Sequence, residues 1–163
     1  MLNDVTTKVD CPYCGRQAEL VHGSEIYLRP GPPQRNLYWL CKPCQAWTGV
    51  HQNSRKYAPK GSLANAELRK KRQDVHAAFD KIWIDGQLTR ANAYFWLAKQ
   101  MGFEKKNCHI GYFDLQQCET ALALVVSFVS AIDLGMKKTA RPMNGEGGLL
   151  NLKTEWIAVK KEF

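Results

Sequence analysis

The chain has 163 residues, a formal net charge of +8 and a sequence pI near 9.2. This length fits one domain, or one domain with a small module attached, and the basic balance favours an acidic partner, with nucleic acid first. The longest apolar stretch, residues 121–132, is about twelve residues long. A membrane span needs roughly twenty, so we expect no membrane-spanning segment.

Two cysteine pairs stand in the first third of the chain. Cys11 and Cys14 form the first pair, Cys41 and Cys44 form the second, and 26 residues lie between the pairs. Each pair has the two-residue spacing of a zinc knuckle, and Gly15 supplies the conformational freedom that the turn after a knuckle needs. Four thiolates complete a closed tetrahedral site. The spacing therefore predicts one structural Zn²⁺ ion.

Two other uses of the cysteines are less consistent with the sequence. Six cysteines are too few for a disulfide scaffold of this length, and residues 1–8 lack the apolar core of a signal peptide. We therefore expect a cytoplasmic protein with reduced thiols. The βαβ context of a thioredoxin-like redox site is missing around either pair.

Strand-like segments surround the two knuckles. Residues 18–28 are expected to form a strand with a turn at 23–24, and residues 36–40 and 46–51 two further strands. A small antiparallel sheet with a knuckle at its ends is the layout of a zinc ribbon. We assign residues 1–53 to this four-cysteine module.

Residues 54–135 are predicted to form a basic linker followed by three helices. Ser62 is expected to cap the first helix, which runs to about residue 83. Thr89 caps the second and Gly102 ends it. The third begins at residue 114.

The third helix begins with a capping-box-like pair, Asp114 and Gln117. Residues 136–163 are predicted to be a flexible linker with a candidate terminal strand at 152–159. The predicted fold class is α+β, with an antiparallel four-cysteine zinc ribbon packed on about three helices and a C-terminal tail.

A series of motifs in order resembles a known family. The motifs are Cys11-Pro-Tyr-Cys14-Gly15, Cys41-x-x-Cys44, Gly49-Val-His51, Gly61-Ser-Leu-Ala64, Leu68-Arg-x-x-Arg72-x-x-x-His76-x-x-Phe79-Asp80-x-x-Trp83, Arg90-x-x-Ala93-Tyr-x-Trp-Leu-Ala98 and His109-Ile-Gly-Tyr-Phe-Asp114. Over about residues 9–120 the chain is similar to the zinc-finger-containing domain of unknown function found in bacteriophages and prophages. The resemblance implies a phage or prophage protein of the host cytoplasm and implies no reaction.

The basic excess follows the ribbon. Residues 54–72 carry seven basic side chains against Glu67 alone, whereas residues 1–53 carry five basic and four acidic ones. We predict a non-catalytic protein that binds DNA or RNA by phosphate contacts and by stacking on ribbon aromatics. The candidate residues are Arg55, Lys56, Lys60, Arg69, Lys70, Lys71, Arg72, Tyr38 and Trp39. The competing interpretation is that the charges form a solvated face and that the rings cover the ribbon core.

Three alternatives remain open at this point. The basic region also suits docking on an acidic surface of a host protein of the transcription, replication or defence machinery, with the terminal strand available for strand addition. An enzyme would need His76, Asp80 and His109 to meet in one pocket. A second metal would need ligands from Cys108, His109 and Cys118, whose spacing matches no known pattern.

Overall fold

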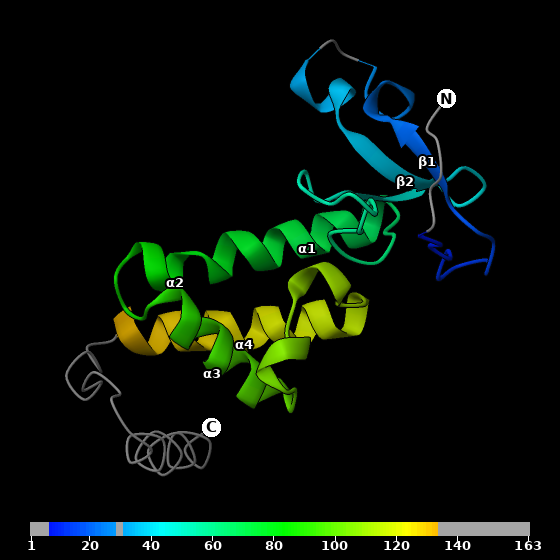
Figure 1. The fold of residues 1–163 in the computed structure, drawn as a ribbon. Helices are drawn as coiled ribbons and strands as arrows, with labels where there is room; N and C mark the ends of the chain where they lie inside the picture. The colour runs from blue at the N-terminus through cyan, green and yellow to red at the C-terminus, as the bar shows by residue number, and fades with distance from the viewer. Residues whose placement is uncertain (1–6, 29–30, 134–163) are drawn as a thin grey trace. The chain divides into compact units, whose positions relative to one another are not determined.

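The computed structural model describes residues 7–28 and 31–133, and its contacts divide the chain into two compact units, Met1–Val126 and Ser127–Phe163. The ribbon and most of the helical region belong to the first unit (Figure 1). The predicted linker and terminal strand at residues 136–163 lie outside the described residues.

The ribbon sheet has three antiparallel strands in the order β1-β2-β3, namely β1 (Glu19–His22), β2 (Leu37–Cys41) and β3 (Ala46–Gly49). Trp39 in the central strand pairs with Leu20 on one side and with Thr48 on the other. The first strand is shorter than predicted, because a 3-10 turn (Gly23–Glu25) ends it before residues 26–28.

After β3 the chain doubles back along this strand. Val50 bridges to Pro59, Trp47 bridges to Ala64, and the Lys60 amide donates to the Gly49 carbonyl at 2.8 Å. Residues 58–64 therefore cover the open edge of β3 and lead directly into the first helix.

Apolar side chains cover both faces of the sheet. On one face, the rings of Tyr27, Tyr38 and Trp47 lie 5.3–5.6 Å apart between centroids, mostly edge to face. On the other face, Trp39 packs in a cluster that includes two of the knuckle cysteines and Leu63. Rings and thiols thus supply the small hydrophobic core that a module of this size can build.

Four α-helices follow in the described part of the chain: α1 (Ala66–Phe79), α2 (Lys81–Ile84), α3 (Arg90–Met101) and α4 (Leu115–Asp133). The first predicted helix is thus divided in two at Asp80, which ends α1 and precedes α2. Figure 1 shows α1 beside the part of α4 that belongs to the first unit, residues 115–126, and Lys71 on α1 forms an ion pair of 3.6 Å with Glu119 on α4.

The helix ends follow the predicted chemistry with one exception. Thr89 accepts from the Asn92 amide at 3.3 Å to begin α3, and Gly102 ends it in the left-handed region at φ 73°. The prediction of Ser62 as the cap of α1 is wrong. Asn65 caps that helix and accepts from the Leu68 amide at 2.9 Å, because the hydroxyl of Ser62 is taken by a side chain of α1 itself.

The capping box of α4 is confirmed. The Asp114 amide donates to Gln117 at 2.9 Å, and the Gln117 amide donates to Asp114 at 2.7 Å. Buried apolar side chains from α1 to α4 form the core of the helical region. They are Leu68, Val75, Phe79, Ile82, Ala93, Leu97, Ala98, Ile110, Phe113, Cys118, Ala121 and Val125. The α+β fold with a zinc-ribbon-like site is thereby confirmed.

None of the described helices combines the length and the apolar character that crossing a bilayer requires.

Candidate metal centre and nucleic-acid interface

The side chains of the four knuckle cysteines lie close together. The sulfur atoms of Cys11, Cys14, Cys41 and Cys44 all lie within 4.8 Å of one another, and Cys14 Sγ is 3.6 Å from Cys41 Sγ. Sulfurs on a tetrahedron with Zn–S bonds of about 2.3 Å are about 3.8 Å apart, whereas a disulfide needs about 2.05 Å. The arrangement fits one zinc ion held by four thiolates.

A residue in the left-handed region follows each knuckle. Gly15 follows the first pair at φ 69°, and Gln45 follows the second pair at φ 50°. The Gly15 amide donates to the Cys11 carbonyl at 2.9 Å, and the Gln45 amide donates to the Lys42 carbonyl at 3.2 Å. A left-handed residue after each pair turns the chain sharply once it has passed the second cysteine of the knuckle. Glycine adopts this conformation without strain, and Gln45 adopts it at a cost of about 1 kcal/mol.

The electrostatics of the thiols favour a cation at their centre. A backbone hydrogen bond from Arg16 stabilises the Cys14 thiolate and lowers the pKa of Cys14 to about 7. The neighbouring Cys14 sulfur, together with burial, raises the pKa of Cys44 to about 12, and burial raises the pKa of Cys41. Four negative charges this close repel one another, and a divalent ion allows all four thiolates to coexist.

The two knuckles also contact the start of α1. The Tyr13 hydroxyl in the first knuckle accepts from the Asn65 amide at 3.1 Å. The Arg69 guanidinium donates to the carbonyl of Gln45, just after the second knuckle, at 3.3 Å. A metal that fixes the knuckles therefore also fixes the beginning of α1 against the ribbon.

The remaining two cysteines are core residues. Cys108 and Cys118 are buried, and burial raises the pKa of both, that of Cys108 to about 11. The hypothesis of a second metal on Cys108, His109 and Cys118 is not supported, since within the described residues the four knuckle cysteines form the cluster suited to a metal.

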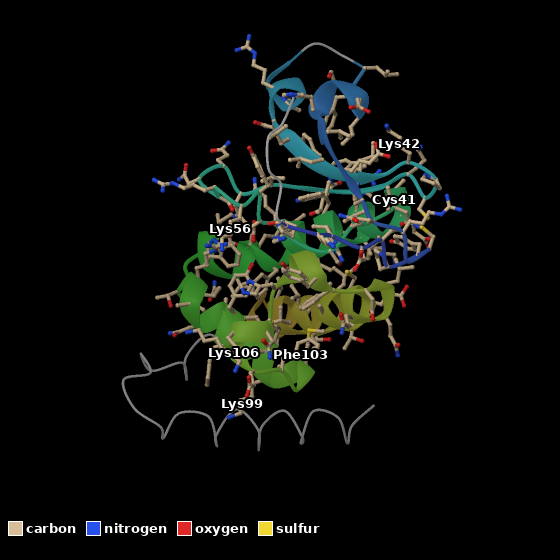
Figure 2. All side chains as sticks on the ribbon, turned by 45° about the vertical axis from the view of Figure 1, so that its right-hand side comes forward. Cys41, Lys42, Lys56, Lys99, Phe103 and Lys106 are labelled. Carbon is tan, nitrogen blue, oxygen red and sulfur yellow. The ribbon has the colours of Figure 1, made fainter. Side chains whose placement is uncertain are left out.

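The predicted nucleic-acid residues fall into groups with different surroundings. Arg55, Lys56 and Lys60 are exposed on the segment after β3, and Figure 2 labels Lys56 on that segment. Lys70 is exposed and pairs with Asp74 at 2.6 Å, while Lys71 is partly exposed and pairs with Glu119. The charges of Arg55, Lys56 and Lys60 are therefore available to a ligand, whereas Lys70 and Lys71 form ion pairs with carboxylates.

Arg72, which was also predicted as a phosphate contact, is buried rather than on the open surface. It is 9% exposed, and its guanidinium donates twice to the Phe113 carbonyl at 2.9 and 2.7 Å and to the carbonyl and hydroxyl of Ser62 at 2.9 and 2.7 Å. Arg69 is half-buried, lies over the Trp47 ring at 4.3 Å and donates to the Ala64 carbonyl. Both arginines connect the ribbon segment to the helices.

Tyr38 and Trp39 are also less accessible than expected. Tyr38 is 8% exposed and Trp39 is 2% exposed, and the Trp39 indole donates to the Tyr57 carbonyl at 2.8 Å. The two rings do point to opposite sheet faces, but each face is covered by other side chains. The predicted stacking platform on these two rings is therefore absent from this structure.

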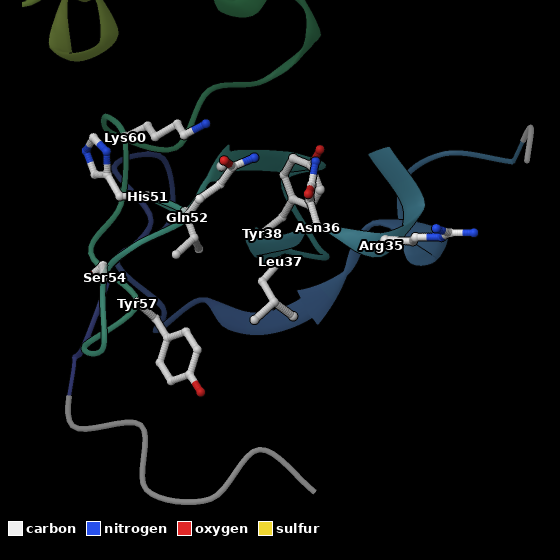
Figure 3. Close-up of a pocket in the computed structure, with 11 residues that line it drawn as sticks. Arg35, Asn36, Leu37, Tyr38, His51, Gln52, Ser54, Tyr57 and Lys60 are labelled. Carbon is white, nitrogen blue, oxygen red and sulfur yellow. The ribbon is translucent and has the colours of Figure 1, made fainter. Parts of the chain in front are cut away.

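The structure contains a hollow that the sequence did not reveal, between the start of β2 and the segment after β3. It has a volume of about 300 Å³. Figure 3 shows Lys60 and His51 on one side, and Asn36 and Tyr38 on the other, with Gln52 reaching between them. We call this the smaller hollow.

A second hollow of about 520 Å³ lies between β3, α1 and the residues around Gly111, and we call it the larger hollow. It shares Gly49 and Lys60 with the smaller one. Its other polar lining side chains are Thr48, Arg69, Arg72, Gln73, His76, Tyr94 and His109. The described residues that line the two hollows include arginine, lysine and histidine side chains and not one aspartate or glutamate.

The structure brings together two of the three residues of the predicted acid–base cluster. His76 and His109 both line the larger hollow, and Asp80 does not. His76 Nδ1 lies 3.8 Å from the Asp80 carboxylate, beyond hydrogen-bond distance. Helical spacing alone identified His76 and Asp80 as neighbours, but the approach of His109 depends on the tertiary fold.

The comparisons with known proteins agree with this metal centre. Searches of curated proteins and of solved structures found no match. Over residues 7–127, which is most of the chain and includes all four clustered cysteines, the sequence matches the family described as zinc-finger-containing domain. The chain therefore belongs to this family of zinc-finger-containing domains.

Proposed function

We propose that this protein is a non-catalytic nucleic-acid-binding protein whose zinc ribbon and helices together hold a single strand along the two hollows. The observation that carries the proposal is the charge of their lining. Two adjoining hollows share Lys60, and the described residues that line them contribute cations and neutral donors without a carboxylate. Phosphate groups supply the negative charges that such a lining attracts.

The surroundings of the hollows support the same ligand. Arg55 and Lys56 are exposed on the segment that forms a wall of the smaller hollow, and Arg35 lies at its edge. None of these three side chains forms an ion pair with another described residue. Cations without carboxylate partners keep their full charge for a ligand, whereas paired cations such as Lys70 do not.

A single strand fits the hollows better than a duplex does. Arg72 lines the larger hollow although it is 9% exposed, so a group that reaches it has to enter the surface. The backbone of a duplex is tied to a second strand and contacts proteins mainly through its outer phosphates. An isolated strand can bend into a concave, cationic track.

The zinc centre has a supporting role in this proposal. Protein thiolates fill all four positions around the metal, so the metal offers no open position for water or substrate. The knuckles instead hold the start of α1, because Tyr13 accepts from the Asn65 amide and Arg69 of α1 donates to the Gln45 carbonyl, and Arg69 is part of the larger hollow. The zinc ion thus contributes to binding by fixing the ribbon side of the larger hollow relative to its helical side.

The test is a fluorescence-anisotropy titration of the zinc-loaded protein with labelled single-stranded DNA, duplex DNA and RNA at about 50–300 mM salt. The single strands are expected to bind more tightly than the duplex, and log K to fall linearly with log salt. Lys60→Glu is expected to weaken binding about tenfold or more and to flatten the salt slope by about one unit.

Lys99→Glu is the matched control. Lys99 is exposed on α3, outside both hollows, and Figure 2 shows it well apart from Lys56. This variant makes the same charge change and is expected to have a small effect. No binding of any of the three ligands at physiological salt would contradict the proposal and would favour the alternative, a host-protein partner. Equal losses in both variants would show that net charge, not the hollows, governs binding.

A further inference from the structure

The larger hollow has the features of a phosphate site within the proposed nucleic-acid track. Its lining includes donors from separate parts of the fold: Lys60 before α1, Arg72, Gln73 and His76 on α1, and His109 after α3. Lys60 has no ion-pair partner among the described residues. Donors that converge from several elements are more rigidly placed than those on one flexible loop.

Arg72 gives this hollow a buried positive charge that has neutral hydrogen-bond partners. A guanidinium has five N–H donors, and four of them are bound by the carbonyls of Phe113 and Ser62 and by the Ser62 hydroxyl. All three acceptors are neutral, and no salt bridge to Arg72 exists within the described residues. A charge removed from water in this way gains much from an anion brought close to it.

The wall beside Arg72 is built from closely crossing backbone. A Cβ on Gly61 would lie 2.1 Å from the Gly111 carbonyl oxygen, and the Ser62 amide donates to that same oxygen at 3.0 Å. Both glycines line the hollow. The crossing fixes the segment that carries Lys60 and Ser62 against the segment that follows His109, so the donors on the two segments keep a constant separation.

We infer that the larger hollow binds one internal phosphodiester group of the strand, with Lys60, Arg72, Gln73, His76 and His109 around its oxygens. This inference rests on the proposed function and names the part of the ligand that this hollow recognises. The phosphate is internal, because the smaller hollow begins at Lys60 and Gly49, where the larger one ends. A strand whose phosphate lies in the larger hollow can therefore continue past Lys60 into the smaller one.

Gln73 offers a test that leaves the fold intact. Its side chain is exposed and lines the hollow, so Gln73→Glu places a carboxylate there with almost no change of volume. We expect Gln73→Glu to weaken binding of a labelled single-stranded DNA about tenfold, because two like charges a few ångströms apart repel strongly near a protein surface. Gln73→Lys is expected to strengthen binding by a similar factor.

Gln116→Glu and Gln116→Lys are the matched controls. Gln116 is exposed on α4 and does not line either hollow. Both controls are expected to change the affinity less than threefold. If the two Gln73 variants bind like the Gln116 variants while Lys60→Glu still weakens binding, the phosphate site is refuted and the proposed function stands. If the unmodified protein binds no strand at all, the proposed function fails first.

The position of the phosphate along the strand is tested with the same variants. Strands with a 5′-hydroxyl and with a 5′-phosphate are compared, and we expect Gln73→Glu to weaken both equally. If only the 5′-phosphorylated strand responds to Gln73→Glu, the hollow recognises a terminal phosphate, and the assignment to an internal phosphodiester is overturned.

Discussion

Removal of the buried guanidinium of Arg72 should destabilise the protein severely. Arg72→Met keeps most of the apolar stem and removes four hydrogen bonds of 2.7–2.9 Å. The carbonyls of Phe113 and Ser62 then lose charge-assisted partners, each worth about 1.5–3 kcal/mol, although the desolvation cost of the guanidinium is recovered in part. A net loss of about 3–5 kcal/mol follows, a large share of the roughly 5–15 kcal/mol that stabilises a typical domain.

The loss is measured by urea denaturation of zinc-loaded, reduced protein, followed by tryptophan fluorescence. Lys71→Met is the matched control on the next residue, because its partly exposed ion pair with Glu119 should contribute less than about 1 kcal/mol. Ser62→Ala removes one acceptor and should cost about 1 kcal/mol. If Arg72→Met lost no more than Lys71→Met, Arg72 would not be the structural link described above.

The remaining predictions concern the metal, the backbone and the chemistry of the site. Metal analysis should find one zinc ion per chain. Cys11→Ser should lower this zinc content and Cys108→Ala should leave it unchanged, and equal zinc contents in the two variants would contradict the four-cysteine centre. In the folded protein at pH 8, iodoacetamide should leave Cys108 unmodified, because burial raises its pKa to about 11 and keeps it a thiol, and rapid alkylation would refute this. The methyl group of Gly15→Ala meets open space, so this variant should lose only about 1 kcal/mol of folding free energy to the left-handed backbone strain. The methyl group of Gly61→Ala meets the Gly111 carbonyl, so this variant should lose about 2–3 kcal/mol or more. Chemical denaturation measures both losses, and a larger loss for Gly15→Ala would contradict the account. RNA incubated with the protein should keep its length on a denaturing gel. Cleavage of the RNA that disappears when the two histidines of the larger hollow are replaced would contradict a non-catalytic function.

The sequence predicted those features whose chemistry is local. Knuckle spacing identified the four metal ligands, and Thr89, Gly102 and the Asp114–Gln117 pair marked helix ends correctly, because capping depends on residues a few positions apart. Ser62 shows the limit of such signals. Serine caps helices about as well as asparagine does. Asn65 is the cap here because the Ser62 hydroxyl accepts a hydrogen bond from Arg72 of α1.

The roles of individual charges and rings depended on the tertiary structure. Arg72 lies in the same helical row as Leu68, Val75 and Phe79, and this periodicity was a signal that it faces inward. Trp39 alternates with Tyr38 as expected, but sequence alternation does not reveal that both sheet faces are covered. The larger hollow joins residues from 47 to 111, so no local pattern could have predicted it.

The most direct test of the account locates the bound strand on the protein. At 18.5 kDa the zinc-loaded protein suits ¹H–¹⁵N correlation spectra, recorded during titration with a single-stranded DNA of about ten nucleotides. The account predicts that the largest shift changes occur at the amides of Gly49, Lys60, Gly61 and Gly111, along both hollows, while those of Lys99 and its neighbours on α3 stay unchanged. Shift changes centred on α3, or none along the hollows at saturating DNA, would contradict it.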